Sequence, residues 1–188
     1  AYEIYQCDWS SDVCSSDLSI ASLVALVATP LALGLSAPAS AVPSTGLIIT
    51  EVYPGGGNAG ATYNADFVEL YNASNAPISL GGKSIQYRSA TSATTATNVY
   101  PLPAVSVPSH AYFLVGGTSG ANGTAFPRPA DVTTGLAAGG TAGQVFLADS
   151  ATGINAGSGA AIDYSAGKVI DFFGYGTASA YETAVKTG

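Results

Sequence analysis

The chain has 188 residues, and its 12 acidic and five basic residues give a formal net charge of −7. That length suits a single domain. So few cations argue against a nucleic-acid-binding protein and against a polybasic patch for anionic lipid. Only 9% of the residues are charged, and this scarcity, with many β-branched and aromatic residues, favours an all-β extracellular module.

Residues 1–18 are polar and acidic, and they contain both cysteines and the only tryptophan. The run Asp12–Leu18 resembles the translation of a widely used sequencing adapter, so we expect residues 1–18 to be artefactual and exclude them from the fold. Four of the 12 acidic residues lie there, which leaves eight acidic and five basic residues and a net charge of −3. Because Cys7 and Cys14 lie there too, we expect no disulfide in the domain. The alternative is a genuine N-terminal extension.

Residues 19–41 have the pattern of a secretory signal peptide that lacks its basic start. The apolar run Ile20–Leu35 is interrupted by proline and glycine, and it is too short for the roughly 20 residues that cross a bilayer. Small residues at its end match a cleavage site. We therefore expect secretion with cleavage after Ala41, followed by a linker over residues 42–46. The alternative is an uncleaved anchor.

Residues 47–188 predict one domain built from short strands with turn signals between them. The expected strands are Leu47–Tyr53, Asp66–Asn72, Ile78–Leu80, Ser84–Arg88, Val99–Leu102, Ala111–Gly116, Gly143–Asp149 and Val169–Gly176. The fifth contains proline and is expected at a sheet edge, and the sixth is expected at a sheet centre. Residues 130–136 are expected to form one helical turn or an irregular segment. Residues 55–65 predict a flexible loop, and residues 89–97 predict a mobile hairpin tip.

These pieces, in this order, resemble the lamin-tail domain family. The most specific block is Phe67–Asn72 followed by the Leu-Gly-Gly corner at residues 80–82. Weaker matches are Ile48–Tyr53, Leu102–Pro103, Tyr112–Val115 and Val169–Gly176. The similarity covers about residues 47–181.

The resemblance implies an immunoglobulin-like β-sandwich in a secreted bacterial protein. In such proteins the module commonly precedes a larger catalytic region, often a metal-dependent nuclease. Relatives usually continue into a further strand after the Gly-Tyr-Gly segment, so we expect this chain, which stops at Gly188, to be truncated at the C-terminus. Truncation would leave a sheet edge unpaired.

Three carboxylates, Glu51, Asp66 and Glu69, are the best candidates for a metal site. They lie in or beside two predicted strands, and carboxylates gathered at strand ends can bind Ca²⁺, which takes six to eight oxygen ligands. Further acidic residues that would join them from loops are Asp149, Asp163 and Asp171. No Asp-x-Asp-x-Asp spacing is present, and a hydrogen-bonding role for Glu69 within the fold is the favoured interpretation.

No catalytic residue and no cofactor are expected in this chain. His110 is the only histidine, and nothing marks the adjacent Ser109 as an activated nucleophile, so a surface turn histidine is favoured over a triad base. Gly81–Ser84 contains Gly-Lys-Ser but lacks the upstream glycine and the helix of a phosphate-binding loop. We expect a corner there instead.

Tyrosines are numerous for so short a chain. The candidates for a ligand platform are Tyr53, Tyr63, Tyr71, Tyr87, Tyr100 and Tyr112. Tyrosine rings at loop ends can stack on sugars or bases, although filling the sandwich core with the hydroxyl at the rim is the favoured role.

We therefore expect a non-catalytic extracellular β-sandwich that acts as an interaction or targeting module and binds through the loop tips 55–65 and 89–97. One alternative is the N-terminal fragment of a secreted nuclease or phosphatase whose catalytic domain lies beyond Gly188. A second alternative is a carbohydrate-binding module. The partner would be an extracellular protein, a glycan or a covalently linked downstream catalytic domain.

Overall fold

The computed structural model describes residues 46–158, 161–162, 164 and 168–182. By compactness the chain divides into Ala1–Ala37 and Pro38–Gly188. The first unit lies outside the described residues, and so do the predicted cleavage site and the C-terminal end. Within the described ranges, no helix has the length and hydropathy that crossing a membrane requires.

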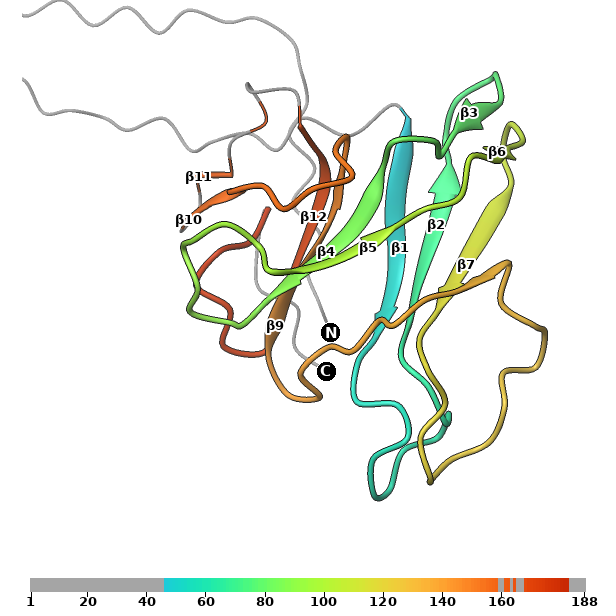
Figure 1. Ribbon diagram of the computed structural model, residues 1–188, viewed down its shortest axis with the longest axis vertical. Helices are drawn as coiled ribbons and strands as arrows, with labels where there is room; N and C mark the ends of the chain where they lie inside the picture. Colours follow the sequence, from blue (N-terminus) through green and yellow to red (C-terminus); the bar gives the residue numbers. More distant parts are fainter. Residues whose placement is uncertain (1–45, 159–160, 163, 165–167, 183–188) are drawn as a thin grey trace, which may run out of the picture. The chain divides into compact units, whose positions relative to one another are not determined.

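The described residues form strands and loops without any α-helix, and most strands belong to two four-stranded sheets (Figure 1). The first sheet has the order β1 (Leu47–Tyr53), β2 (Phe67–Asn72), β7 (Tyr112–Gly116) and β8 (Val132–Thr133). The second has the order β12 (Val169–Tyr175), β9 (Gly143–Ala148), β4 (Ser84–Arg88) and β5 (Asn98–Pro101). Neighbours are antiparallel except β7 and β8, which are parallel.

Two short strand pairs complete the described elements. They are β3 (Ile78–Ser79) with β6 (Ser106–Val107), and β10 (Gly157–Ser158) with β11 (Ala161–Ile162). All eight predicted strands are present, β5 lies at a sheet edge and β7 lies inside a sheet, as expected. Residues 130–136 form no helical turn and are mostly irregular, the second of the two expected alternatives, but Val132–Thr133 within them form β8 by pairing with β7. Strands β6, β10 and β11 were not predicted.

The main core lies between the two sheets and follows from the alternation of each strand. In β2, Val68 and Leu70 point inward, and they pack in one cluster with Ile85 of β4 and Val145 and Leu147 of β9. All five side chains are fully buried. Removing such a side chain from water contributes about 1.5–3 kcal/mol, so this layer holds the sandwich together.

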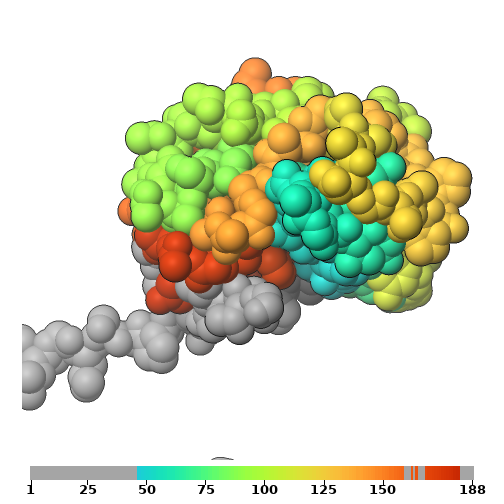
Figure 2. Space-filling model, turned by 90° about the horizontal axis from the view of Figure 1, so that it is seen from below, coloured from blue at the N-terminus to red at the C-terminus, as the bar shows by residue number. Residues whose placement is uncertain are grey.

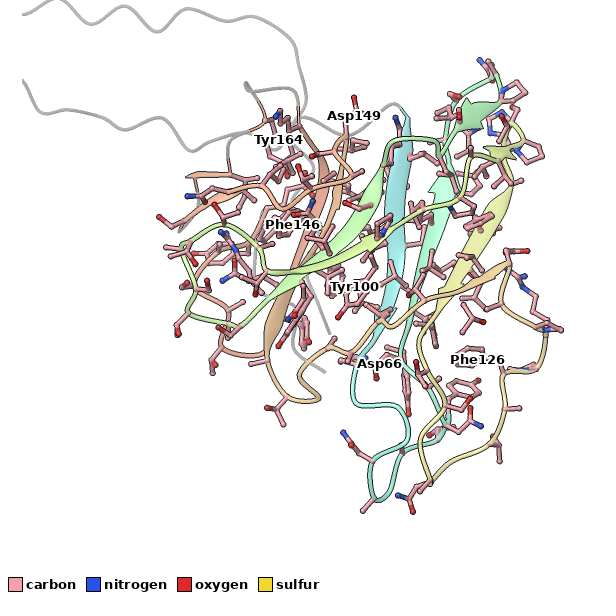
Figure 3. The ribbon with its side chains drawn as sticks, in the orientation of Figure 1. Asp66, Tyr100, Phe126, Phe146, Asp149 and Tyr164 are labelled. Atoms are coloured by element: carbon pink, nitrogen blue, oxygen red, sulfur yellow. The ribbon has the colours of Figure 1, made fainter. Side chains whose placement is uncertain are left out.

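A second apolar cluster lies on the outer face of the second sheet. Phe146 of β9 and Phe172 of β12 stack there with ring centroids 5.5 Å apart. Loop residues cover them, among them Ala96, Ile154 and Ala180. Strand β9 is consequently buried on both faces along its whole length; Figure 3 labels Phe146 in this region.

Asp171 links the two sheets at one edge of the sandwich. Its Oδ2 accepts a hydrogen bond from the backbone N–H of Ile49 on β1, and its Oδ1 accepts one from the N–H of Phe172, 3.0 Å away. Both strands bulge at this point, β1 between Ile49 and Glu51 and β12 just before Asp171. Burial raises the pKa of Asp171 to about 6, with a smaller contribution from the charge of Glu182, while the two N–H donors oppose the shift.

Candidate functional site

The glycine-rich loop 55–65 is joined by hydrogen bonds to the loop 117–124 that follows β7. Asn64 N–H donates to the Thr124 carbonyl (2.8 Å), and Gly120 N–H donates back to the Asn64 carbonyl (2.6 Å). A Cβ atom at Gly57 would lie 2.6 Å from the Cα of Gly120, so this contact requires glycine. The two loops lie side by side in teal and yellow in Figure 2. The loop 55–65, which the sequence predicts to be flexible, is therefore hydrogen-bonded to the loop 117–124 at several positions.

Asp66 fixes the base of this loop cluster. Asp66 is 6% exposed, and its carboxylate accepts hydrogen bonds from the backbone N–H groups of Gly56 (2.5 Å) and Ala138 (2.6 Å), which belong to two different loops. Burial raises the pKa of Asp66, and the backbone donors oppose that shift. Because both carboxylate oxygens accept backbone hydrogen bonds, Asp66 holds these two loops together.

Glu51 and Glu69 face each other directly across β1 and β2. Glu69 Oε1 accepts a hydrogen bond from Thr50 Oγ1 at 2.8 Å. Glu69 lies between the inward-pointing Val68 and Leu70, so Glu69 and its register partner Glu51 lie on the outer face of the first sheet. Asp66 is instead buried at the base of the loop. The structure therefore brings two of the three calcium candidates together and not the third.

The additional acidic candidates are also separate from one another. Asp149 forms an ion pair with Lys83 at 2.7 Å, and Asp171 lies between the sheets. Asp163 lies outside the described residues. In the part of the chain that the structure describes, no group of three or more His, Cys, Asp or Glu residues could hold a metal ion.

The loop 89–97, expected as a mobile tip, is docked on the outer face of the second sheet. The buried amide of Gln144 donates to the carbonyls of Ala90 (2.6 Å) and Ser92 (3.1 Å), and Ala96 is 3% exposed. The sequence did not predict this docking, because the loop covers the cluster of Phe146 and Phe172, which the sequence does not place next to it.

Every second residue of β4 hydrogen-bonds a second covering loop, residues 150–157. Ser84 Oγ donates to the Ser150 carbonyl (2.6 Å), Gln86 Nε2 donates to the Thr152 carbonyl (2.9 Å) and Arg88 contacts the Asn155 side chain (3.3 Å). All three β4 side chains are buried. The polar face of β4, which the sequence pattern suggests is exposed to solvent, is thus covered by a loop.

Arg88 is a buried charge on the outer face of the second sheet. It is 4% exposed, and its guanidinium lies 5.7 Å from the Phe146 ring centroid and 5.8 Å from that of Phe172. Its acceptors are neutral oxygens: Gln144 Oε1 at 2.7 Å, Asn155 Oδ1 and the carbonyls of residues 94 and 157. Burial lowers the pKa of Arg88. Sequence analysis missed this residue because its partners lie in distant loops.

His110 lies in the turn before β7 and does not meet a nucleophile. Its Nε2 is 3.0 Å from Asn75 Oδ1 and its Nδ1 is 3.3 Å from the Tyr71 hydroxyl. Ser109 Oγ instead donates to the Ser74 carbonyl at 2.8 Å. The interpretation of His110 as a surface turn residue fits this geometry.

The segment Gly81–Ser84 is a corner, as predicted. Lys83 N–H donates to the Leu80 carbonyl at 3.0 Å to close a turn, and Gly82 has a positive φ of 78°. Lys83 pairs with Asp149. The structure therefore gives Gly-Lys-Ser no helix and no phosphate-binding geometry.

The predicted tyrosines divide among three places, and in one of them Tyr87 and Tyr100 pack against the main core. Tyr53 and Tyr63 pack with Phe67 and Phe126 at the loop end of the first sheet. Tyr71 and Tyr112 lie at the other end of that sheet, with ring centroids 4.7 Å apart. Tyr112 is 56% exposed, whereas the other five candidates are partly buried.

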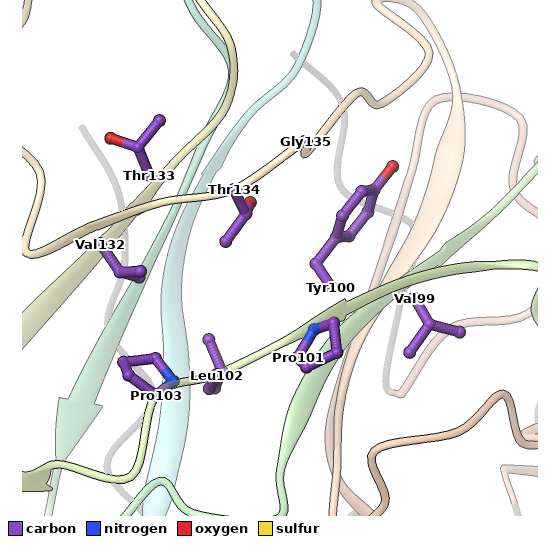
Figure 4. A pocket seen from close by; sticks show the side chains of 9 residues that line it. All are labelled: Val99, Tyr100, Pro101, Leu102, Pro103, Val132, Thr133, Thr134 and Gly135. Atoms are coloured by element: carbon purple, nitrogen blue, oxygen red, sulfur yellow. The ribbon is translucent and has the colours of Figure 1, made fainter.

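A groove of about 620 Å³ separates the free edges of β5 and β8 (Figure 4). Residues 99–103 form one wall and residues 132–135 form the other, and none of them is charged. Tyr100 Oη accepts a hydrogen bond from Ala137 N–H at 3.2 Å, which fixes the ring beside the groove. The described residues around the groove include no acid, base or nucleophile pair that would support catalysis.

A comparison with known protein families agrees with the fold described above. A family model described as Lamin Tail Domain matches residues 40–177, well over half of the chain. None of the curated proteins matches it.

Proposed function

The chain belongs to the lamin-tail domain family, and from this membership we propose that its domain acts outside the cell as a non-catalytic module that binds a partner. The family is an immunoglobulin-like β-sandwich of the interaction type, and the described strands build such a sandwich. The partner classes expected from the sequence are an extracellular protein, a glycan and a covalently linked catalytic domain.

The observation that carries the proposal is how the fold uses its ionisable groups. Catalytic groups with shifted pKa values usually face a cleft. Here the carboxylates with raised pKa values, Asp66 and Asp171, accept backbone hydrogen bonds that join separate segments, and the guanidinium of Arg88 binds neutral loop oxygens. These groups hold the sandwich together, which leaves its exposed surface for binding.

Export is tested by expressing the full chain with its own residues 19–41 in a secreting bacterial host. We expect the chain in the culture medium, and mass spectrometry of its N-terminus should begin at Val42 because the small residues before it match a signal-peptidase site. A chain that stays in the cells, or that keeps residues 19–41 in the membrane fraction, contradicts this part of the proposal.

The non-catalytic character is tested by assaying the secreted chain against duplex DNA and a phosphate monoester with Mg²⁺, Mn²⁺ or Ca²⁺. We expect no turnover above that of a mock preparation from the same host. Turnover that follows the chain through two chromatographic steps would show that it is an enzyme.

A further inference from the structure

The end of β2 lies beside the start of β7, next to the β3–β6 pair (Figure 1). Two neighbouring tyrosines lie at this place. Tyr71 and Tyr112 are register partners, and their rings are tilted by 42° at a centroid distance of 4.7 Å. His110 and Asn75 adjoin them through the hydrogen bonds described above. We call Tyr71, Asn75, His110 and Tyr112 the tyrosine patch.

The patch rests on a buried amide. Asn72 is 0% exposed, and its Nδ2 donates to the carbonyls of Ala76 (2.8 Å) and Val107 (3.0 Å), so it holds both turns that carry the patch. His110 N–H donates to the Asn72 carbonyl at 3.0 Å. His110 has φ of +56°, a left-handed conformation that costs energy for a residue other than glycine. The patch is therefore held in place before any ligand arrives.

The hydrogen-bond pattern shows which groups the patch can offer. An amide oxygen only accepts, so His110 Nε2 donates to Asn75 Oδ1, and in the neutral form of the ring Nδ1 accepts from the Tyr71 hydroxyl. The Asn75 amide nitrogen and the Tyr112 hydroxyl have no hydrogen-bond partner among the described residues. The exposed Tyr112 ring thus carries an open hydroxyl, and it is connected through Tyr71 and His110 to the open donor of Asn75.

This combination fits a neutral sugar. A pyranose ring presents a C–H face that packs on an aromatic ring, and it is edged by hydroxyls that both donate and accept. Nucleic-acid bases also stack on tyrosine, but their phosphates require cations. Glu51 and Glu69 lie on the outer face of the same sheet, and their charges repel phosphate.

We propose that the tyrosine patch binds a neutral polysaccharide, with the Tyr112 ring stacked on a sugar and Asn75 Nδ2 donating to a sugar hydroxyl. The inference rests on the proposed binding function and gives that function a ligand class and a site. A protein ligand is a separate outcome that the test must distinguish.

The test measures depletion of the full chain from solution by cellulose, chitin and insoluble β-1,3-glucan, followed by titration with the matching soluble oligosaccharide. We expect retention on at least one of the three polysaccharides. Tyr112→Thr removes the ring but keeps a residue that favours strands, and it should weaken binding by at least about tenfold, in the range that loss of one stacking ring produces. Asn75→Ala should weaken it by about threefold or more.

Tyr164→Ala is the matched control. Tyr164 is also exposed, and its hydroxyl donates to Glu182, so its loss should leave sugar binding unchanged. Unfolding midpoints of all variants should agree with that of the original chain.

Absence of retention on all three polysaccharides overturns the inference, and so does retention that survives Tyr112→Thr. If the chain is exported and catalytically silent and Tyr112→Thr abolishes only capture of a purified protein, the proposed function stands and the sugar assignment is wrong. If the chain is not exported, the proposed function fails whatever the sugars show.

Discussion

On the outer face of the second sheet, Gln86, Arg88 and Phe146 are buried beneath loops. On the outer face of the first sheet, Glu51 and Tyr112 are exposed to solvent. Both faces come from strands that alternate polar and apolar residues. The difference shows that alternation of polar and apolar residues does not by itself identify the solvent-exposed face of a sheet. Loops can cover a face whose residues are polar.

The two faces consequently have different uses. Side chains on the second sheet satisfy the backbone of two covering loops, so their loss should lower stability. The exposed side chains Glu51 and Tyr112 on the outer face of the first sheet make few bonds within the fold, so their loss should change binding instead. Substitutions on each face test this division.

The largest effect is expected from Phe146→Ala on the closed face. Phe146 is fully buried and stacks on Phe172, and a cavity of this kind costs about 3–5 kcal/mol. Chemical denaturation of the full chain measures the loss, and Phe146→Leu, which keeps most of the volume, is the matched control with a smaller loss. A loss below about 1 kcal/mol for Phe146→Ala would show that the loops do not seal this face.

Arg88→Met should give the next largest effect. Methionine preserves much of the volume over the two phenylalanines but removes the guanidinium donor from Gln144 Oε1 and from the carbonyls of residues 94 and 157. Asn155 Oδ1 also loses this donor and keeps only the N–H of residue 157. We expect a loss of about 2–4 kcal/mol from the unpaired buried oxygens. The amide of Ile154 in the covering loop should also exchange hydrogen faster than in the original chain. A variant as stable as the original would mean that the charge is dispensable there.

This closed face also marks the limit of what the sequence predicts. The strand β4 follows from local alternation, which needs no knowledge of distant residues. The closure of its outer face depends on pairs 66 to 69 residues apart, such as Ser84 with Ser150 and Arg88 with Gly157. Loop docking of that kind leaves no local signal, which is why residues 89–97 were expected to be mobile.

The tyrosine patch shows the same limit. The sequence singled out Tyr71 and Tyr112 as possible stacking residues, but their adjacency depends on the register of β2 and β7. Nothing in the sequence connects Asn75 with these two tyrosines. Its contact with His110 follows from two turns that Asn72 joins, and only the pairing of the strands brings these turns together.

The junction between the sheets gives a third test, through pH. Because the folded pKa of Asp171 is about 6 and the unfolded value is about 3.9, the folded state binds the extra proton between these values. The contribution of Asp171 to the free energy of unfolding is therefore most favourable below about pH 4 and declines as pH rises to about 6, by up to about 3 kcal/mol.

Asp171→Asn removes this titration while keeping an oxygen that can accept from Ile49 N–H. The difference in unfolding free energy between variant and original chain should move in favour of the variant as pH rises from 4 to 7. Denaturation curves at five pH values measure it. A difference that stays constant, or that moves the other way, contradicts the assigned burial of Asp171, whereas Phe146→Ala and Arg88→Met should lower stability at every pH in this range.

The smallest effect on stability is expected from Tyr112→Thr on the open face. Tyr112 is 56% exposed, and its ring packs on the ring of Tyr71. Threonine keeps the strand preference, and exposed substitutions usually change stability by no more than about 0.5 kcal/mol. The same denaturation assay used for Phe146→Ala measures it. A loss above about 2 kcal/mol would place Tyr112 among the residues that hold the sandwich together, and the open face would then share the structural role of the closed one.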